Sequence, residues 1–144
     1  MTQYPGGDFD VELLECERQS IRFMADFDAQ RYEQASTLFA PDGVWHRPDG
    51  DIHGREDFLS RMAQRPRGLL VRHVMTNLRS RRIDQDTICV ESYVTVYRYD
   101  FEQEISYPAA LAGPAVMGRY TDVLKRAGGV WMIHDKSVSI DFKR

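Results

Sequence analysis

The first part of the chain carries apolar residues at helical spacing. From residue 8 to residue 28 they recur every three, four or seven positions, which predicts an amphipathic helix of about five turns. Residues 1–7 contain Pro5, Gly6 and Gly7 and are expected to form a loose arm. The side of the helix predicted to face inward carries Val11, Leu14, Ile21, Met24 and Asp28.

Two shorter helices and one short strand are predicted next. The second helix ends at the turn signal Pro41-Asp42-Gly43, and residues 43–48 read as a strand. The third helix opens at Gly54 and ends before Pro66. The apolar side of the second helix carries Tyr32, Ala35, Leu38 and Phe39.

From residue 69 onward the pattern is typical of strands. Four long runs, 69–83, 87–101, 116–125 and 130–142, are rich in β-branched and aromatic residues. Short turns join the first to the second and the third to the fourth, so these neighbours should pair antiparallel. The connection 102–115 has a length typical of functional or disordered loops. The chain is therefore predicted to be one α+β domain over residues 1–144, whose curved sheet encloses a cone-shaped cavity beneath the helices.

The strand 69–83 carries the most informative polar residues. Because side chains alternate along a strand, its inward face should hold Leu69, Val71, His73, Met75 and Asn77. A buried imidazole must find a partner, and imidazole readily exchanges a proton at neutral pH. His73 is therefore either a catalytic acid and base or a core histidine bonded to a backbone carbonyl. Asn77 either binds a substrate oxygen or satisfies a neighbouring strand end.

Asp28 is the second candidate for chemistry. It shares the inward side of the first helix with Ile21 and Met24, at the helix C-terminus, where a carboxylate in the cavity is a plausible general base. Alternatively, Asp28 caps the helix that begins near Gln30 or Arg31. In the first case Asp28 and His73 face the same cavity.

Composition and charge narrow the class of protein. The net charge of −3 gives no support to nucleic-acid binding, and the arginines at 61–67 and 79–82 are interpreted as solvated surface. Cys16 and Cys89 have no metal, redox or disulfide spacing, so a reducing cytoplasm is expected. The N-terminus does not resemble a signal peptide, and the longest apolar run, 107–118, contains Pro108 and Pro114 and is too short for a membrane span.

No metal or cofactor is predicted. His46 and His53 flank a turn that contains Asp49 and Asp51, but their spacing matches no common metal motif and favours surface loop chemistry. The chain also contains no glycine-rich phosphate loop and no GxSxG elbow.

Four stretches together resemble a known superfamily. They are MADFDAQRYEQASTLFAPDGVW, RHVMTN, GRYTDVL and GGVWMIHDKSVSIDF, in that order. The chain resembles the nuclear transport factor 2-like (NTF2-like) superfamily over roughly residues 8–142, most closely its SnoaL-like and scytalone dehydratase-like branch. The resemblance implies a cone-shaped α+β barrel of the cystatin-like class, with a deep and mostly apolar pocket for a small hydrophobic molecule. It also implies a homodimer formed through the outer face of the sheet.

The resemblance also assigns roles to residues. Dehydratase-like members use an aspartate after the first helix and a histidine on the first long strand, and Asp28 and His73 match these positions. Phe27 stands where such members often carry a tyrosine, and GRYTDVL lacks a second pocket histidine. These departures argue against the scytalone dehydratase reaction itself and leave a general proton-transfer site.

Several other residues are candidates for the pocket wall. Tyr120 and Asp122 share one strand face, and Asp122 alternatively pairs with a surface arginine. Lys136 stands where many relatives carry an arginine, although a solvated strand lysine is the favoured interpretation. Tyr32 and Trp45 are interpreted as core or pocket wall. The complete set of predicted substrate-binding residues is Phe27, Tyr32, Trp45, Met75, Asn77, Tyr120 and Lys136.

Two classes of function follow from the sequence. The first is a cofactor-independent lyase or isomerase in which His73 and Asp28 move a proton on a small, hydrophobic, oxygenated aromatic, polyketide-like or steroid-like molecule. Dehydration is the first choice, followed by double-bond isomerisation or ring closure. The second is a non-catalytic ligand-binding module or a small, β-type subunit of an aromatic-ring dioxygenase. A third possibility, epoxide hydrolysis, requires a water-activating Asp-Arg-Asp set that is not evident in this sequence.

Overall fold

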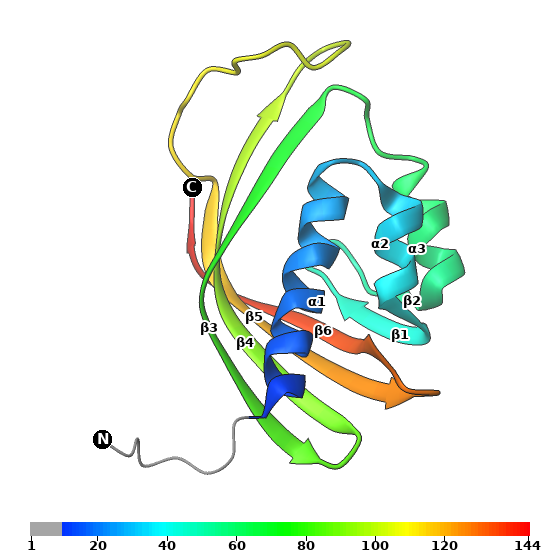
Figure 1. The fold of residues 1–144 in the computed structure, drawn as a ribbon. Coiled ribbons are helices and arrows are strands. Elements are labelled where there is room, and N and C mark those ends of the chain that lie inside the picture. Colours follow the sequence, from blue (N-terminus) through cyan, green and yellow to red (C-terminus); the bar gives the residue numbers. More distant parts are fainter. Residues whose placement is uncertain (1–9) are drawn as a thin grey trace.

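The computed structural model describes residues 10–144 as three helices and six strands (Figure 1). The helices are α1 (Val11–Asp28), α2 (Tyr32–Leu38) and α3 (Gly54–Met62). The strands are β1 (Phe39–His46), β2 (Ile52–His53), β3 (Leu69–Asp84), β4 (Thr87–Asp100), β5 (Val116–Ala127) and β6 (Val130–Lys143). The arm predicted at 1–7 lies outside the described residues, as does the helix start at Asp8. Over residues 10–144, no helix has the length and apolar character needed to cross a bilayer.

The strands form one mixed sheet in the order β2-β1-β6-β5-β4-β3. Every neighbouring pair is antiparallel except β1 and β6, which run parallel. Figure 1 shows this sheet curving around α1, with α2 and α3 on the same side. The prediction of an α+β fold, with three helices packed on a curved and mainly antiparallel sheet, is confirmed.

β1 begins four residues earlier than the sequence predicted. Phe39, expected on the second helix, is the first strand residue and pairs with Ile133. The turn signal Pro41-Asp42-Gly43 is instead a bulge within β1, since the pairing with β6 shifts between Phe39 and Val44. Gly43 fits here because a Cβ at this position would lie 3.0 Å from the Ile133 carbonyl oxygen.

The buried side of α1 also differs from the prediction. Val11, Leu14 and Ile21 are 64%, 42% and 44% exposed, so the predicted inward row is wrong for these three residues. The physical reason is the size of the aromatic side chains on the neighbouring row, which bury more apolar area against the sheet. The residues of α1 that are buried are Cys16, Ser20, Phe23, Met24 and Phe27.

Aromatic rings form the centre of the core. Phe23 is fully buried and contacts the rings of Phe39, Trp45 and Phe58 at centroid distances of 6.1, 5.5 and 5.6 Å. These rings come from α1, β1 and α3, so one cluster joins two helices to the sheet edge. The cluster fixes the C-terminal half of α1 against the sheet and thereby positions Asp28.

His46 links two parts of the β1 region through its ring. Its Nδ1 lies 3.1 Å from Asp51 Oδ2 and its Nε2 lies 3.0 Å from Asp135 Oδ2. The hydrogen bond to Asp135 raises the pKa of His46 above its ordinary value, with Asp51 as the next cause. His46 was interpreted as a surface loop residue. This interpretation is wrong, because His46 lies on β1 and its ring bridges β6 and the segment that precedes β2.

We expect the His46→Gln variant to lose stability in acid more than in alkali. A raised folded-state pKa means that the stabilisation is fully present below the unfolded pKa, near 6.5, and disappears as pH rises through the folded value. Because His46 is 46% exposed, the loss below pH 6.5 should not exceed about 1 kcal/mol. Urea unfolding at pH 5.5 and pH 8.5 measures it, and an equal loss at both pH values would contradict the assignment.

Candidate active site

The end of α1 brings Asp28 to the inner face of β3. Gln30 adopts a positive φ of 60°, and Arg31 N donates to the Asp26 carbonyl at 2.8 Å, which is the Schellman pattern of helix termination. Asp28 is the last residue of the helix, and the N-cap of α2 is Arg31, which makes no side-chain cap. The alternative interpretation of Asp28 as a helix cap is therefore wrong.

Asp28 binds His73 twice. Its Oδ1 lies 2.6 Å from His73 Nδ1, and its Oδ2 accepts a 2.7 Å hydrogen bond from the His73 backbone N–H. Both side chains are 10% exposed. The carboxylate therefore fixes both the ring of His73 and the backbone of β3. The partner of the ring is this carboxylate and not the backbone carbonyl expected for a core histidine.

This arrangement determines which ring nitrogen of His73 is available. A carboxylate facing Nδ1 keeps the proton on that atom, so the neutral ring presents Nε2 as a proton acceptor. Among residues 10–144, no side chain or backbone group is hydrogen-bonded to Nε2. When Nε2 takes up a proton, both the Asp28 carboxylate and the negative end of the α1 dipole stabilise the imidazolium.

Two aromatic rings enclose the imidazole. Phe27 contacts His73 edge-on at 5.7 Å between centroids, and Tyr120 stacks against it at 6.5 Å. Burial raises the pKa of Tyr120, with the nearby Asp122 carboxylate as the next cause. The phenol therefore stays protonated at neutral pH and can act as a hydrogen-bond donor.

His73 lines a cavity of about 190 Å³ between the helices and the sheet. The wall is mostly aliphatic and aromatic and draws on α1, β1, β3, β4, β5 and β6. Phe27, Trp45 and Tyr120, three of the predicted substrate-binding residues, belong to it. The lining residues are Phe27, Trp45, Arg47, Pro48, Arg65, Val71, His73, Val94, Val96, Arg98, Ala115, Val116, Tyr120, Val138 and Ile140.

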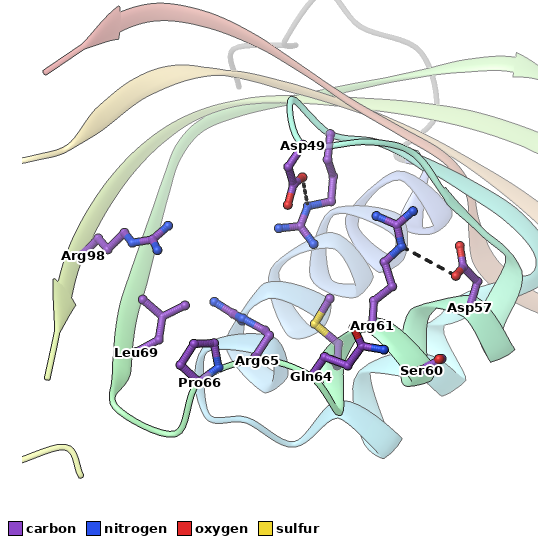
Figure 2. A pocket seen from close by; sticks show the side chains of 11 residues that line it. Asp49, Asp57, Ser60, Arg61, Gln64, Arg65, Pro66, Leu69 and Arg98 are labelled. Atoms are coloured by element: carbon purple, nitrogen blue, oxygen red, sulfur yellow. Dashed lines mark ion pairs between the residues drawn. The ribbon is translucent and has the colours of Figure 1, made fainter. Parts of the chain in front are cut away.

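A larger and more polar hollow of about 520 Å³ adjoins this cavity (Figure 2). Arg47, Arg65 and Arg98 line both spaces, so they lie where the outer hollow meets the cavity. We call these three residues the arginine rim. Arg65 was predicted to be solvated surface, and neither Arg47 nor Arg98 was among the predicted site residues. The sequence does contain one indication that Arg98 faces the cavity: it lies on the same face of its strand as Val94 and Val96.

Tyr32 and Met75 lie behind the cavity wall. The ring of Tyr32 packs edge-on against Phe27 at 5.6 Å, and its hydroxyl accepts a 3.1 Å hydrogen bond from Arg65. Met75 is partly buried and packs against the hydrophobic core. Neither residue belongs to the wall of the cavity.

Asn77 is outside the cavity because β3 bulges at this point. Its φ is +54°, and the pairing with β4 shifts between Thr76 and Arg79. The bulge ends the regular alternation and leaves Asn77 exposed, while Leu78 packs toward the core. Both alternatives for Asn77 placed it on the inward face, and the bulge overturns that placement.

Lys136 and Asp122 form an ion pair beneath Tyr120. The Nζ atom lies 3.1 and 3.2 Å from the two carboxylate oxygens, and the side chains are 0% and 1% exposed. The interpretation of Lys136 as solvated is wrong, as is the pairing of Asp122 with a surface arginine. The two residues face each other across β5 and β6, and the sheet curvature encloses both. Lys136 also lies 3.8 Å from the Tyr120 ring centroid and does not line the cavity.

Comparisons with known proteins agree with the fold. A family model described as a SnoaL-like domain matches residues 14–136. A protein of unknown function with a cystatin-like fold from Nostoc punctiforme is 23% identical, with a TM-score of 0.70, and the alignment covers 92% of this chain and 93% of that one. ActVI-ORFA from Streptomyces coelicolor is 18% identical, with a TM-score of 0.72 and coverages of 92% and 98%.

A third structure similar to this chain contains a ligand. It is a protein from Catenulispora acidiphila in complex with S-DNPA, 22% identical, with a TM-score of 0.68 and coverages of 89% and 92%. At these identities the three structures show the shared fold alone. The search of curated proteins gave no match.

Proposed function

We propose that this chain, which belongs to the family of SnoaL-like domains within the NTF2-like superfamily, is a cofactor-independent lyase or isomerase that moves a proton on a small hydrophobic molecule. The observation that carries the proposal is the Asp28–His73 pair, whose free Nε2 belongs to a residue lining a mainly apolar cavity. The complex of a similar protein with S-DNPA supports a small-molecule ligand.

The chemistry begins with proton removal at a carbon next to a carbonyl. His73 Nε2 accepts the proton, and the Asp28 carboxylate stabilises the resulting imidazolium. The electron pair of the broken C–H bond moves onto the carbonyl oxygen as an enolate. Tyr120, the phenol of the cavity wall, is suited to donate a hydrogen bond to that oxygen.

The second step returns the proton from the imidazolium. If it goes to a β-hydroxyl group, water leaves, the enolate collapses and an unsaturated ketone forms. If it goes to another carbon of the conjugated system, the product is a double-bond isomer. Dehydration is our first choice, since one acid–base group in a mainly apolar cavity serves both proton transfers of an elimination.

A panel of aromatic β-hydroxy ketones and β,γ-unsaturated ketones tests the function directly. In D2O we expect the wild-type protein to catalyse α-carbon deuteration of at least one member, observed by NMR, together with dehydration or isomerisation. Free imidazole at the same concentration is the control for non-specific base catalysis. Binding of panel members with neither exchange nor dehydration nor isomerisation above that control would overturn the enzyme proposal and favour the ligand-binding module.

The outer face of the sheet favours association with another chain. Val74, Tyr93 and Tyr97 are 46%, 41% and 36% exposed, and their strand positions alternate with those that face the cavity. We propose a homodimer through this face, as the resemblance to the superfamily implies. Light scattering after gel filtration measures it; a monomer that co-purifies with a larger iron protein would instead favour the dioxygenase subunit.

A further inference from the structure

The charged groups of the cavity wall have one sign. Arg47, Arg65 and Arg98 belong to the wall, whereas no aspartate or glutamate does within residues 10–144. The outer hollow adds Arg61, which pairs with Asp57 at 3.6 Å. A molecule that enters the cavity therefore passes a positive rim before it reaches the apolar wall.

Arg65 is fixed in place but keeps unused donors. Its guanidinium lies 4.5 Å from the Phe27 ring centroid, and Nη1 donates to the Tyr32 hydroxyl at 3.1 Å. No carboxylate in residues 10–144 pairs with it. A guanidinium has five N–H donors in a planar fork, so a held Arg65 can still bind a carboxylate through two parallel hydrogen bonds.

Within residues 10–144, the carboxylates that pair with the other two arginines of the rim are exposed. Arg98 lies 3.4 Å from Asp100 and Arg47 lies 3.3 Å from Asp49, and these aspartates are 65% and 66% exposed. Exposed pairs of this kind contribute little energy, so a ligand anion can replace them. Burial lowers the pKa of Arg47, and Asp49 opposes that effect while Arg65 adds to it.

We propose that the natural substrate is an anion, with a carboxylate that binds the arginine rim while its oxygenated carbon reaches His73. The inference rests on the proposed use of this cavity as the substrate site, and it adds the charge of the substrate. Figure 2 shows Arg65 and Arg98 on the same side of the outer hollow, near Leu69. A planar aromatic body between the rim and His73 lies against Val71, Val94 and Val96.

Binding of two matched probes tests the proposal without requiring turnover. The probes are 6-hydroxy-2-naphthoate and 6-hydroxy-2-naphthamide, which differ in the charge at one end, and isothermal titration calorimetry at pH 7.5 measures both. We expect the wild-type protein to bind the carboxylate about tenfold or more tightly than the amide. The preference should decrease as salt is increased.

Variants of the rim identify the group responsible. Arg65→Gln and Arg98→Gln should each reduce the preference for the carboxylate. Arg67→Gln should retain it, because Arg67 is exposed and lines neither space. Using two rim variants keeps the test valid if Arg65→Gln fails to fold.

Three outcomes would overturn the proposal: equal affinity for the two probes, no binding of the carboxylate at millimolar concentration, or a preference that neither rim variant reduces. None of them bears on deuterium exchange of neutral ketones, so the proposed proton transfer is tested separately.

Discussion

Replacing Lys136 with methionine is expected to lower the free energy of unfolding by about 3–5 kcal/mol. The substitution leaves the Asp122 carboxylate in the core without its cation, although Nζ contacts both of its oxygens in the wild-type protein. It also removes the ammonium group that lies 3.8 Å from the Tyr120 ring centroid. Urea unfolding at pH 7, followed by circular dichroism, measures the loss.

The double variant Lys136→Met/Asp122→Leu is the matched control. Because it removes both charges, most of the stability should return, and the double-mutant cycle should give a coupling energy of several kcal/mol. Burial lowers the pKa of Lys136 and Asp122 opposes that effect, so the buried ammonium group depends on its carboxylate partner. A single variant that loses less than about 1 kcal/mol would show that the core tolerates an unpaired Asp122.

The sequence predicts the elements that depend on local pattern. Alternation along 69–83 placed His73 on the inner face of β3, and the position of Asp28 at the end of α1 put a carboxylate opposite it. Both inferences needed only the period of a strand or helix and the rule that short turns join antiparallel neighbours. The α+β architecture and the Asp28–His73 contact were accessible for this reason.

The features that the sequence missed depend on contacts between distant segments. The bulge at Asn77 depends on the register between β3 and β4. If strict alternation is assumed through the bulge, the side chain of Asn77 is assigned to the wrong face of the sheet. The buried side of α1 was chosen by the fit of Phe23 and Phe27 to the sheet rather than by the row that carries Val11 and Ile21. The local sequence pattern predicts neither the bulge nor the buried side of α1.

Several charged residues that the structure buries or places at the cavity were predicted to be solvated. A charge is buried only where a distant segment supplies a partner, and the local sequence does not show that partner. Lys136 and Asp122 are fourteen positions apart and meet only because β5 and β6 pair in one register. Arg65 was assigned to solvated surface as part of the arginine cluster at 61–67, yet its guanidinium packs on the ring of Phe27 at the cavity. A strand lysine or a loop arginine is most often solvated, and the pairing across the sheet decides the exceptions.

Asp28→Asn is expected to lower kcat for proton transfer by about 10²- to 10⁴-fold. The asparagine carbonyl can still accept the hydrogen bond from the His73 backbone N–H, so the end of α1 stays attached to β3. Its amide group, however, would donate to Nδ1, which places the ring proton on Nε2 and removes the base. The variant also lacks the negative charge that stabilises the imidazolium.

Kinetics from pH 5 to pH 9 and binding of the neutral probe 6-hydroxy-2-naphthamide distinguish this effect from a structural one. If the role of Asp28 is to hold the tautomer and charge of His73, Asp28→Asn loses kcat while probe affinity and the urea midpoint stay close to wild type. His73→Gln should lose activity by a similar factor. His46→Gln is the control, because His46 also bridges carboxylates but lies outside the cavity. If kcat in Asp28→Asn stayed within threefold of wild type, the pair would be a structural link between α1 and β3, and the site would need another base.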